Sequence, residues 1–281
     1  MLRIAVPNKG TLADPAAQML REAGYRQRPD GRDLVCRDEP NDVEFFYLRP
    51  KDIATYVGSG DLDLGITGRD LLVDAGGAAE EVLDLDFGAA TFRFAARPET
   101  LSSIEEIDGR RVATAYPGVV TRHLAERRLT AEVIRLDGAV ENAIRLGVAD
   151  VIADVVSTGA TLRQAGLVVV GEPILRSSAV LIRPAAAPAN GRVAQLERRL
   201  QGVLVARRYV MLAYDVRADL LDRASALTPG IESPTISPLH REGWVAVEAM
   251  VLRDEVHRIM DELYELGARA ILVTNIHACR L

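Results

Sequence analysis

The chain has 281 residues, of which 48% are hydrophobic and 26% are charged, and its formal net charge is −6. These values are ordinary for a globular protein with a core of normal size, and the acidic balance argues against nucleic acid and against an anionic membrane as partners. The two cysteines, Cys36 and Cys279, have no metal-binding spacing, so we predict a reducing, cytoplasmic environment. The sequence shows neither an apolar run of bilayer length nor a signal-peptide pattern, so we expect no membrane segment and no export.

The first part of the chain alternates short apolar runs with amphipathic segments. We predict strands at residues 2–6, 43–48 and 62–67, and helices at 14–24 and 52–58. Turn residues close these segments, for example Pro7 after the first strand and Gly68 after the third. Strands that alternate with helices are typical of an α/β fold with largely parallel sheets.

A second α/β unit follows, and a strand at 89–96 leads into it. We predict its strands at 112–115, 133–136, 151–156, 168–170 and 179–183, a helix at 118–127 and a helical stripe at 139–147. The segment PAAAPAN at 184–190 reads as a linker or loop, and a helix with one apolar face comes after it. We therefore assign residues 1–90 plus 185–208 to a first domain and 91–184 to a second.

The last part of the chain has a different order of elements. We predict strands at 210–215, 231–236, 244–252 and 270–274, and helices at 218–226 and 256–266. This order, βαββαβ, predicts a ferredoxin-like domain over residues 209–281.

The segment DVVSTGATL at 154–162 carries the clearest chemical pattern. A buried strand ends near Asp154, and hydroxyl side chains and a glycine follow where a helix begins. Glycine allows close approach of a ligand to the backbone, and free amides at the start of a helix favour phosphate. Because an acidic side chain suits sugar hydroxyls, the pattern fits a ribose 5-phosphate site. An ordinary helix cap is the simpler alternative for this segment taken alone.

Residues around this segment resemble the signature of the ATP phosphoribosyltransferase family. The matching positions are Glu141, Gly147, Ala149, Ile152, Asp154, Val155, Thr158, Gly159, Thr161 and Leu162. Further matches are VPNKG at 6–10, RPKDI at 49–53, GITGRD at 65–70, ATAYP at 113–117 and TPGIESPTISPL at 228–239. One departure is Thr11, where many relatives carry a basic residue, so we assign Thr11 no charge role.

The resemblance is to the long, histidine-regulated form, and it implies a fold and a reaction. It implies a two-domain catalytic core similar to periplasmic binding proteins, with the active site in the cleft, and a C-terminal ferredoxin-like regulatory domain. It implies transfer of the phosphoribosyl group of phosphoribosyl pyrophosphate to N1 of ATP, with loss of pyrophosphate, as the first step of histidine biosynthesis. Mg²⁺ would be held mainly by the substrate phosphates, without dedicated metal ligands. L-histidine would inhibit, and the chain would form dimers and hexamers.

The resemblance also suggests roles for particular residues of the core. The proposed pyrophosphate contacts are Lys9, Arg49 and Lys51, and the contacts to the ribose and to the developing oxocarbenium ion are Glu141 and Asp154. The contacts to the ribose phosphate are Ser157, Thr158, Gly159, Ala160 and Thr161, together with Asp154 on the sugar. The ATP contacts are Arg69, Asp70 and Tyr116. Each residue has a simpler alternative. The cations could be solvated surface charges, Asp70 could cap a helix, and Tyr116 could be a buried turn residue before Pro117.

In the C-terminal domain the resemblance suggests a histidine site made of Asp215, Ile231, Ser233, Thr235 and Ala270. Asp215 could instead cap a helix, and the proline-rich stretch could be an edge strand.

Three other functions remain open from the sequence alone. They are a solute-binding protein, a metabolite sensor that binds without turnover, and a phosphoribosyltransferase of the common type, which would carry paired acidic residues before its phosphate loop.

Overall fold

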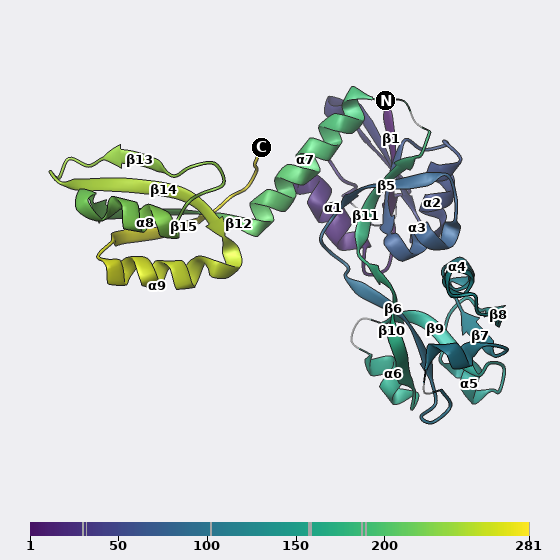
Figure 1. Ribbon diagram of the computed structural model, residues 1–281. Coiled ribbons are helices and arrows are strands. Elements are labelled where there is room, and N and C mark those ends of the chain that lie inside the picture. The colour runs from purple at the N-terminus through teal and green to yellow at the C-terminus, as the bar shows by residue number, and fades with distance from the viewer. Residues whose placement is uncertain are drawn as a thin grey trace. The chain divides into compact units, whose positions relative to one another are not determined.

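The computed structural model describes residues 1–29, 31, 33–101, 103–156, 159–186, 188 and 190–280. They group into two compact units, one of Met1–Arg21 with Tyr25–Val193 and one of Glu22–Gly24 with Ala194–Leu281 (Figure 1). Among the described residues no helix has the length and apolar character that crossing a membrane requires.

The first unit contains two lobes, each built on one sheet. The sheet of the first lobe has the order β2-β3-β1-β4-β11-β5. Its strands are β1 (Leu2–Pro7), β2 (Val35–Asp38), β3 (Val43–Leu48), β4 (Leu64–Gly68), β5 (Ala79–Asp84) and β11 (Ala179–Pro184), and its helices are α1 (Ala13–Glu22), α2 (Pro50–Gly58) and α3 (Arg69–Ala75). Strand β1 pairs in parallel with β3 and β4. Its continuous apolar run is buried, as expected for a central strand covered on both faces.

The sheet of the second lobe has the order β10-β6-β9-β7-β8. Its strands are β6 (Ala90–Ala96), β7 (Arg111–Thr114), β8 (Glu132–Arg135), β9 (Val151–Val156) and β10 (Val168–Ser177), and its helices are α4 (Pro117–Arg127), α5 (Asn142–Arg145) and α6 (Ala160–Gln164). Phe92 and Phe94 are fully buried in its core, against α4.

The chain passes twice between the lobes, from β5 to β6 and from β10 to β11 (Figure 1). Two α/β lobes joined by two crossing segments are the arrangement of periplasmic binding proteins, so the expected core architecture is confirmed. One boundary was wrong. We assigned the strand at 179–183 to the second domain, but β11 pairs with β4 and β5 of the first. Its apolar run predicts a buried strand, but it does not specify which sheet the strand joins.

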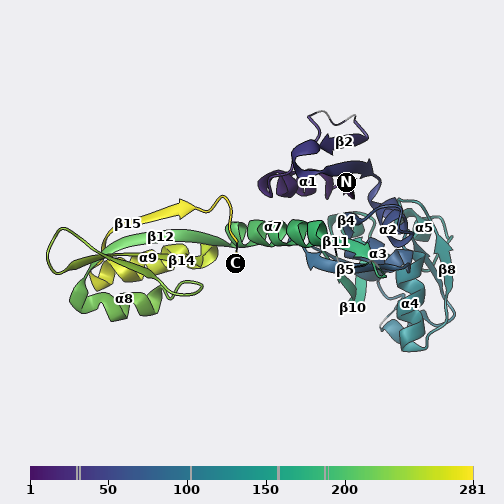
Figure 2. The same ribbon diagram turned by 90° about the horizontal axis from the view of Figure 1, so that it is seen from above.

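The second unit is the expected ferredoxin-like domain, preceded by a helix. Its elements are α7 (Gly191–Arg208), β12 (Tyr209–Arg217), α8 (Leu221–Leu227), β13 (Thr235–Pro238), β14 (Trp244–Leu252), α9 (Val256–Leu266) and β15 (Arg269–Asn275). The antiparallel sheet has the order β13-β14-β12-β15. Figure 2 shows its strands β12, β14 and β15 with α8 and α9. Alternate residues of β12 are buried, and they join α8 and α9 in one core.

Two features of this unit differ from the sequence expectation. The unit begins at Ala194 and not at residue 209, because Arg207 pairs with Glu22 and the backbone of Gly202 lies against Cys279. The strand expected at 231–236 starts only at Thr235, after a turn with a left-handed Gly230.

Candidate active site

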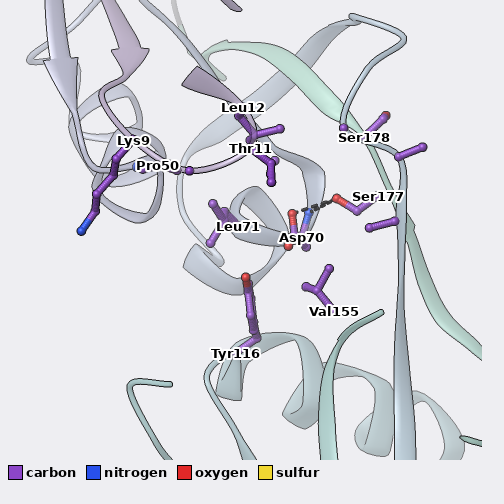
Figure 3. A pocket seen from close by; sticks show the side chains of 15 residues that line it. Lys9, Thr11, Leu12, Pro50, Asp70, Leu71, Tyr116, Val155, Ser177 and Ser178 are labelled. Carbon is purple, nitrogen blue, oxygen red and sulfur yellow. Dashed lines mark hydrogen bonds between the residues drawn. The ribbon is translucent and has the colours of Figure 1, made fainter. Parts of the chain in front are cut away.

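A pocket of about 410 Å³ lies in the first unit, between its two lobes (Figure 3). Its lining residues come from the exits of β1 and β4, from the crossing segments and from the second lobe: Lys9, Gly10, Thr11, Leu12, Pro50, Gly68, Asp70, Leu71, Gly88, Ala89, Ala90, Tyr116, Val155, Ser177 and Ser178. The carboxyl ends of parallel strands are where α/β folds bind ligands. The structure thus brings together Lys9, Asp70 and Tyr116, three of the residues singled out from the sequence.

Asp70 is a buried carboxylate at the floor of this pocket, in the first turn of α3. The Ser177 hydroxyl donates to Asp70 Oδ1 at 2.8 Å, and the Asp70 amide donates to the same hydroxyl oxygen at 3.1 Å. Figure 3 shows both bonds. The partner of Asp70 therefore comes from β10, 107 residues further along the chain.

Tyr116 faces Asp70 from the second lobe. It immediately precedes α4, and its ring packs edge-on against Phe92 with a centroid distance of 5.3 Å. Burial raises the pKa of the Tyr116 hydroxyl well above its usual value, and the nearby carboxylates of Asp70 and Asp154 raise it further. Tyr116 therefore stays protonated and can donate a hydrogen bond to Asp70 or to a ligand.

A smaller cavity of about 120 Å³ lies beside this pocket, and Val155 lines both. It contains most of the predicted ribose and phosphate contacts: Glu141, Asp154, Gly159, Ala160 and Thr161. Ser157 and Thr158 lie outside the described residues. The Val155 amide donates to Asp154 Oδ1 at 2.7 Å. Burial raises the pKa of the Asp154 carboxyl, and the negative charges of Glu141 and Asp70 raise it further.

The helix after the expected phosphate loop is short. Helix α6 has only five residues, so the contribution of a helix dipole to phosphate binding is small. Gly159 precedes it with φ of 69°, a left-handed conformation that other residues adopt at a cost.

The three cations predicted for pyrophosphate lie at the ends of two neighbouring strands. Lys9 follows β1, while Arg49 and Lys51 flank the start of α2 after β3. Lys51 Nζ donates to the Ala115 carbonyl of the second lobe at 3.1 Å. Lys9 lines the larger pocket and extends away from Asp70 (Figure 3), whereas Arg49 and Lys51 are exposed outside its lining.

Arg69 lies next to Asp70 in sequence but not in the pocket lining. Its guanidinium pairs with Glu81 at 2.7 Å and with Asp84 at 2.8 Å, and it donates to Ser178 Oγ at 3.0 Å. These half-buried contacts tie α3 to β5 and to the crossing segment. These contacts give Arg69 a structural role, and the ATP contact expected from the sequence stays a prediction.

The residues predicted for histidine lie in the second unit, in three places. Asp215 is in β12 opposite Arg269, and Ala270 follows in β15 with φ of 51° where the pairing register shifts. A left-handed alanine at a bulge is a strained backbone position, and such positions gather at functional sites. Thr235 is exposed in β13, and Ile231 and Ser233 are in the preceding turn.

Sequence reasoning missed the part of the pocket that the crossing segments form. Ser177 ends β10, Ser178 follows it, and Gly88 and Ala89 precede β6. A Ser-Ser pair between two predicted strands was the available signal. This Ser-Ser pair can be recognised as part of a pocket only when the two strands are assigned to different sheets.

Comparisons with known proteins identify the family of this chain. The family model "ATP phosphoribosyltransferase" matches residues 49–202, and the model "HisG, C-terminal domain" matches 206–278. The chain is 77% identical to the ATP phosphoribosyltransferase of Salinispora tropica over 281 residues and 63% identical to that of Streptomyces avermitilis over 285, covering all of both chains in each case.

Among solved structures, the chain is similar to an ATP phosphoribosyl transferase (HisG:HisZ) complex from Thermotoga maritima. The TM-score is 0.60 at 23% identity, and the similarity covers 72% of this chain and 99% of that one. This likeness concerns the fold alone.

The two-lobed core with carboxylates facing its cleft is that of a ligand-binding α/β protein. The chain belongs to the ATP phosphoribosyltransferase family, the enzymes of the first step of histidine biosynthesis, and it has the long form with a C-terminal domain.

Proposed function

We propose that this enzyme transfers the phosphoribosyl group of phosphoribosyl pyrophosphate to N1 of ATP, with release of pyrophosphate. The observation that carries the proposal is the pair of adjoining cavities, one with Asp70 and Tyr116 and one with Glu141 and Asp154, which share Val155. Two substrates must meet for a direct transfer, and adjacent sites hold their reacting atoms together without a covalent enzyme intermediate.

The charged and aromatic groups of the two cavities give them different roles, one toward the ribose and one toward the nucleotide. Asp154 and Glu141 accept hydrogen bonds from ribose hydroxyls, and their negative charge stabilises the positive charge that develops on the ribose as pyrophosphate leaves. Burial raises the pKa of Asp154, so its ionised form is poorly solvated and interacts strongly with a cation. Tyr116 offers a ring and a hydroxyl to the nucleotide, beside Asp70.

Both substrates are polyanions, and the overall charge of −6 repels them. Lys9, Arg49 and Lys51 supply local positive charge at the strand ends. Mg²⁺ bound to the substrate phosphates would neutralise more, since this ion takes one or two carboxylates together with phosphate oxygens.

We propose further that L-histidine binds the second unit near Asp215 and the Ala270 bulge and inhibits the first unit. A carboxylate can hold the α-amino group, and hydroxyls such as that of Thr235 can hold the carboxylate of the amino acid. A homo-oligomer, dimeric or hexameric, would let several such sites act on one another. The relative in Thermotoga maritima is itself described as a complex.

A spectrophotometric assay tests this function. Purified protein is mixed with ATP, phosphoribosyl pyrophosphate, Mg²⁺ and pyrophosphatase, with and without L-histidine. We expect phosphoribosyl-ATP to form and histidine to suppress it. Product formation that ignores histidine would remove the regulatory proposal and keep the transfer. Tight binding of either substrate without turnover would instead favour the sensor or solute-binding reading.

A further inference from the structure

We propose that Ser177 is a positioning residue that fixes the Asp70 carboxylate for nucleotide recognition. The inference rests on the proposed function and extends it to a residue that has no charge and lies at the crossing between the lobes. Ser177 is the last residue of β10, and it is almost completely buried. Within the described part of the chain its hydroxyl makes two hydrogen bonds, both to Asp70.

These two bonds use the only proton of the hydroxyl and one of its two acceptor lone pairs. The Ser177 proton is donated to Asp70 Oδ1 at 2.8 Å, and the oxygen accepts the Asp70 amide proton at 3.1 Å. A hydroxyl that bridges the amide and the carboxylate of one residue stabilises the observed orientation of that side chain. The second carboxylate oxygen then faces the pocket and Tyr116 (Figure 3).

Helix α3 needs this external partner. The first amides of a helix have no acceptor within the helix, and the residue before α3 is Gly68, which has no side chain to cap it. A Cβ at Gly68 would collide with Asp70 Oδ1, so only glycine leaves room for the carboxylate in this position. Ser177 replaces the missing cap from a strand of the other sheet, and thereby couples the Asp70 orientation to the crossing segment.

Loss of the contact between Ser177 and Asp70 should affect the binding of the nucleotide and not that of phosphoribosyl pyrophosphate. Asp70 lines the pocket with Tyr116, while Glu141 and Asp154 line the neighbouring cavity. Loss of the Ser177 hydroxyl frees the Asp70 carboxylate to rotate and leaves its buried amide without an acceptor. Nucleotide binding should weaken, and binding of phosphoribosyl pyrophosphate should not.

The test is steady-state kinetics of the full chain with Ser177→Ala and Ser177→Thr. We expect Ser177→Ala to raise the KM for ATP about tenfold, and to leave the KM for phosphoribosyl pyrophosphate within about twofold. Ser177→Thr keeps the hydroxyl and should restore the KM for ATP. Thr228→Val is the matched control. Thr228 is also a buried hydroxyl residue, it donates to the Ala224 carbonyl at 3.2 Å within the second unit, and it is not among the residues that line the pocket.

A double-mutant cycle adds a readout that a purely structural role would not change. In an Asp70→Asn background, Ser177→Ala should have little further effect on the KM for ATP, because Ser177 acts through Asp70. Equal increases in both KM values, no increase in either, or full additivity with Asp70→Asn would overturn the inference. Absence of phosphoribosyl-ATP formation by the wild-type enzyme would instead reject the proposed function, so the two failures are distinguishable.

Discussion

Gly118→Ala probes one of the contacts between the two lobes, that of α3 with α4. Gly118 lies in the first turn of α4, and Asp74 of α3 approaches it from the other lobe. Asp74 Oδ1 accepts the amides of Gly118 at 2.7 Å and Val119 at 3.4 Å, so it caps α4 from outside the helix. The residue before α4 is Tyr116, whose side chain makes no capping hydrogen bond.

The geometry sets the size of the expected effect. A Cβ at Gly118 would overlap the Asp74 carbonyl oxygen, and it would lie 3.0 Å from the carbonyl carbon and 3.1 Å from Cα of the same residue. Carbon atoms in contact sit about 3.5–4.0 Å apart, and the oxygen lies closer still, so α3 and α4 must separate by about 1 Å. Alanine improves the helix propensity by up to about 1 kcal/mol over glycine, so we expect α4 to remain folded. The separation moves Tyr116 away from Asp70, and a displacement of about 1 Å in an active site can cost about 10²-fold in rate.

The assay is kcat/KM for ATP, with far-UV circular dichroism to check folding. We expect Gly118→Ala to lose between about 10- and 100-fold. Gly191→Ala is the control, because Gly191 begins α7 with open space around its Cα and the substitution needs no movement. Activity of Gly118→Ala within twofold of wild type would show that lobe spacing does not control the site.

Three further substitutions test other parts of the structure. The raised pKa of Asp154 means that the folded protein holds this proton more tightly than the unfolded chain, so its ionisation destabilises the fold as pH rises between the unfolded and folded pKa values. Asp154→Asn should therefore keep or raise the Tm at neutral pH while kcat falls by about 10²-fold or more; wild-type turnover would reject its role. Arg69→Ala should lower the Tm by about 2–4 °C without changing the KM for ATP, and the reverse pattern would restore Arg69 as an ATP contact. Asp215→Ala should raise the histidine concentration needed for half inhibition by about tenfold or more at unchanged basal kcat, whereas Asp222→Ala, exposed on α8, should not.

Sequence patterns located the elements whose burial is periodic or continuous. The strand at 244–252 and the helix at 256–266 were predicted with their observed ends. Strands β2 and β5 were missed. Their residues are mostly exposed or half-buried and lack an apolar alternation, so backbone pairing at the sheet edges defines them more than their side chains do.

In the site, too, contacts between residues that are close in the sequence were predicted, and contacts between residues that are far apart were not. Glu141 and Asp154 were predicted from one stretch of sequence, and the structure places them in one cavity. The Ser177 contact joins residues 107 positions apart and depends on where β11 pairs, which periodicity does not reveal. Arg69 shows that a cation at a strand exit is equally suited to a structural ion pair, which the sequence pattern did not indicate.

The most direct test of the central proposal is the product of a single incubation. Wild-type enzyme is mixed with ATP, phosphoribosyl pyrophosphate and Mg²⁺, and phosphoribosyl-ATP is quantified by mass spectrometry beside released pyrophosphate. We expect the two products in equal amounts, and neither product above background with folded Asp154→Asn. Pyrophosphate without phosphoribosyl-ATP, or no product from folded wild-type enzyme, would contradict direct transfer between the two cavities.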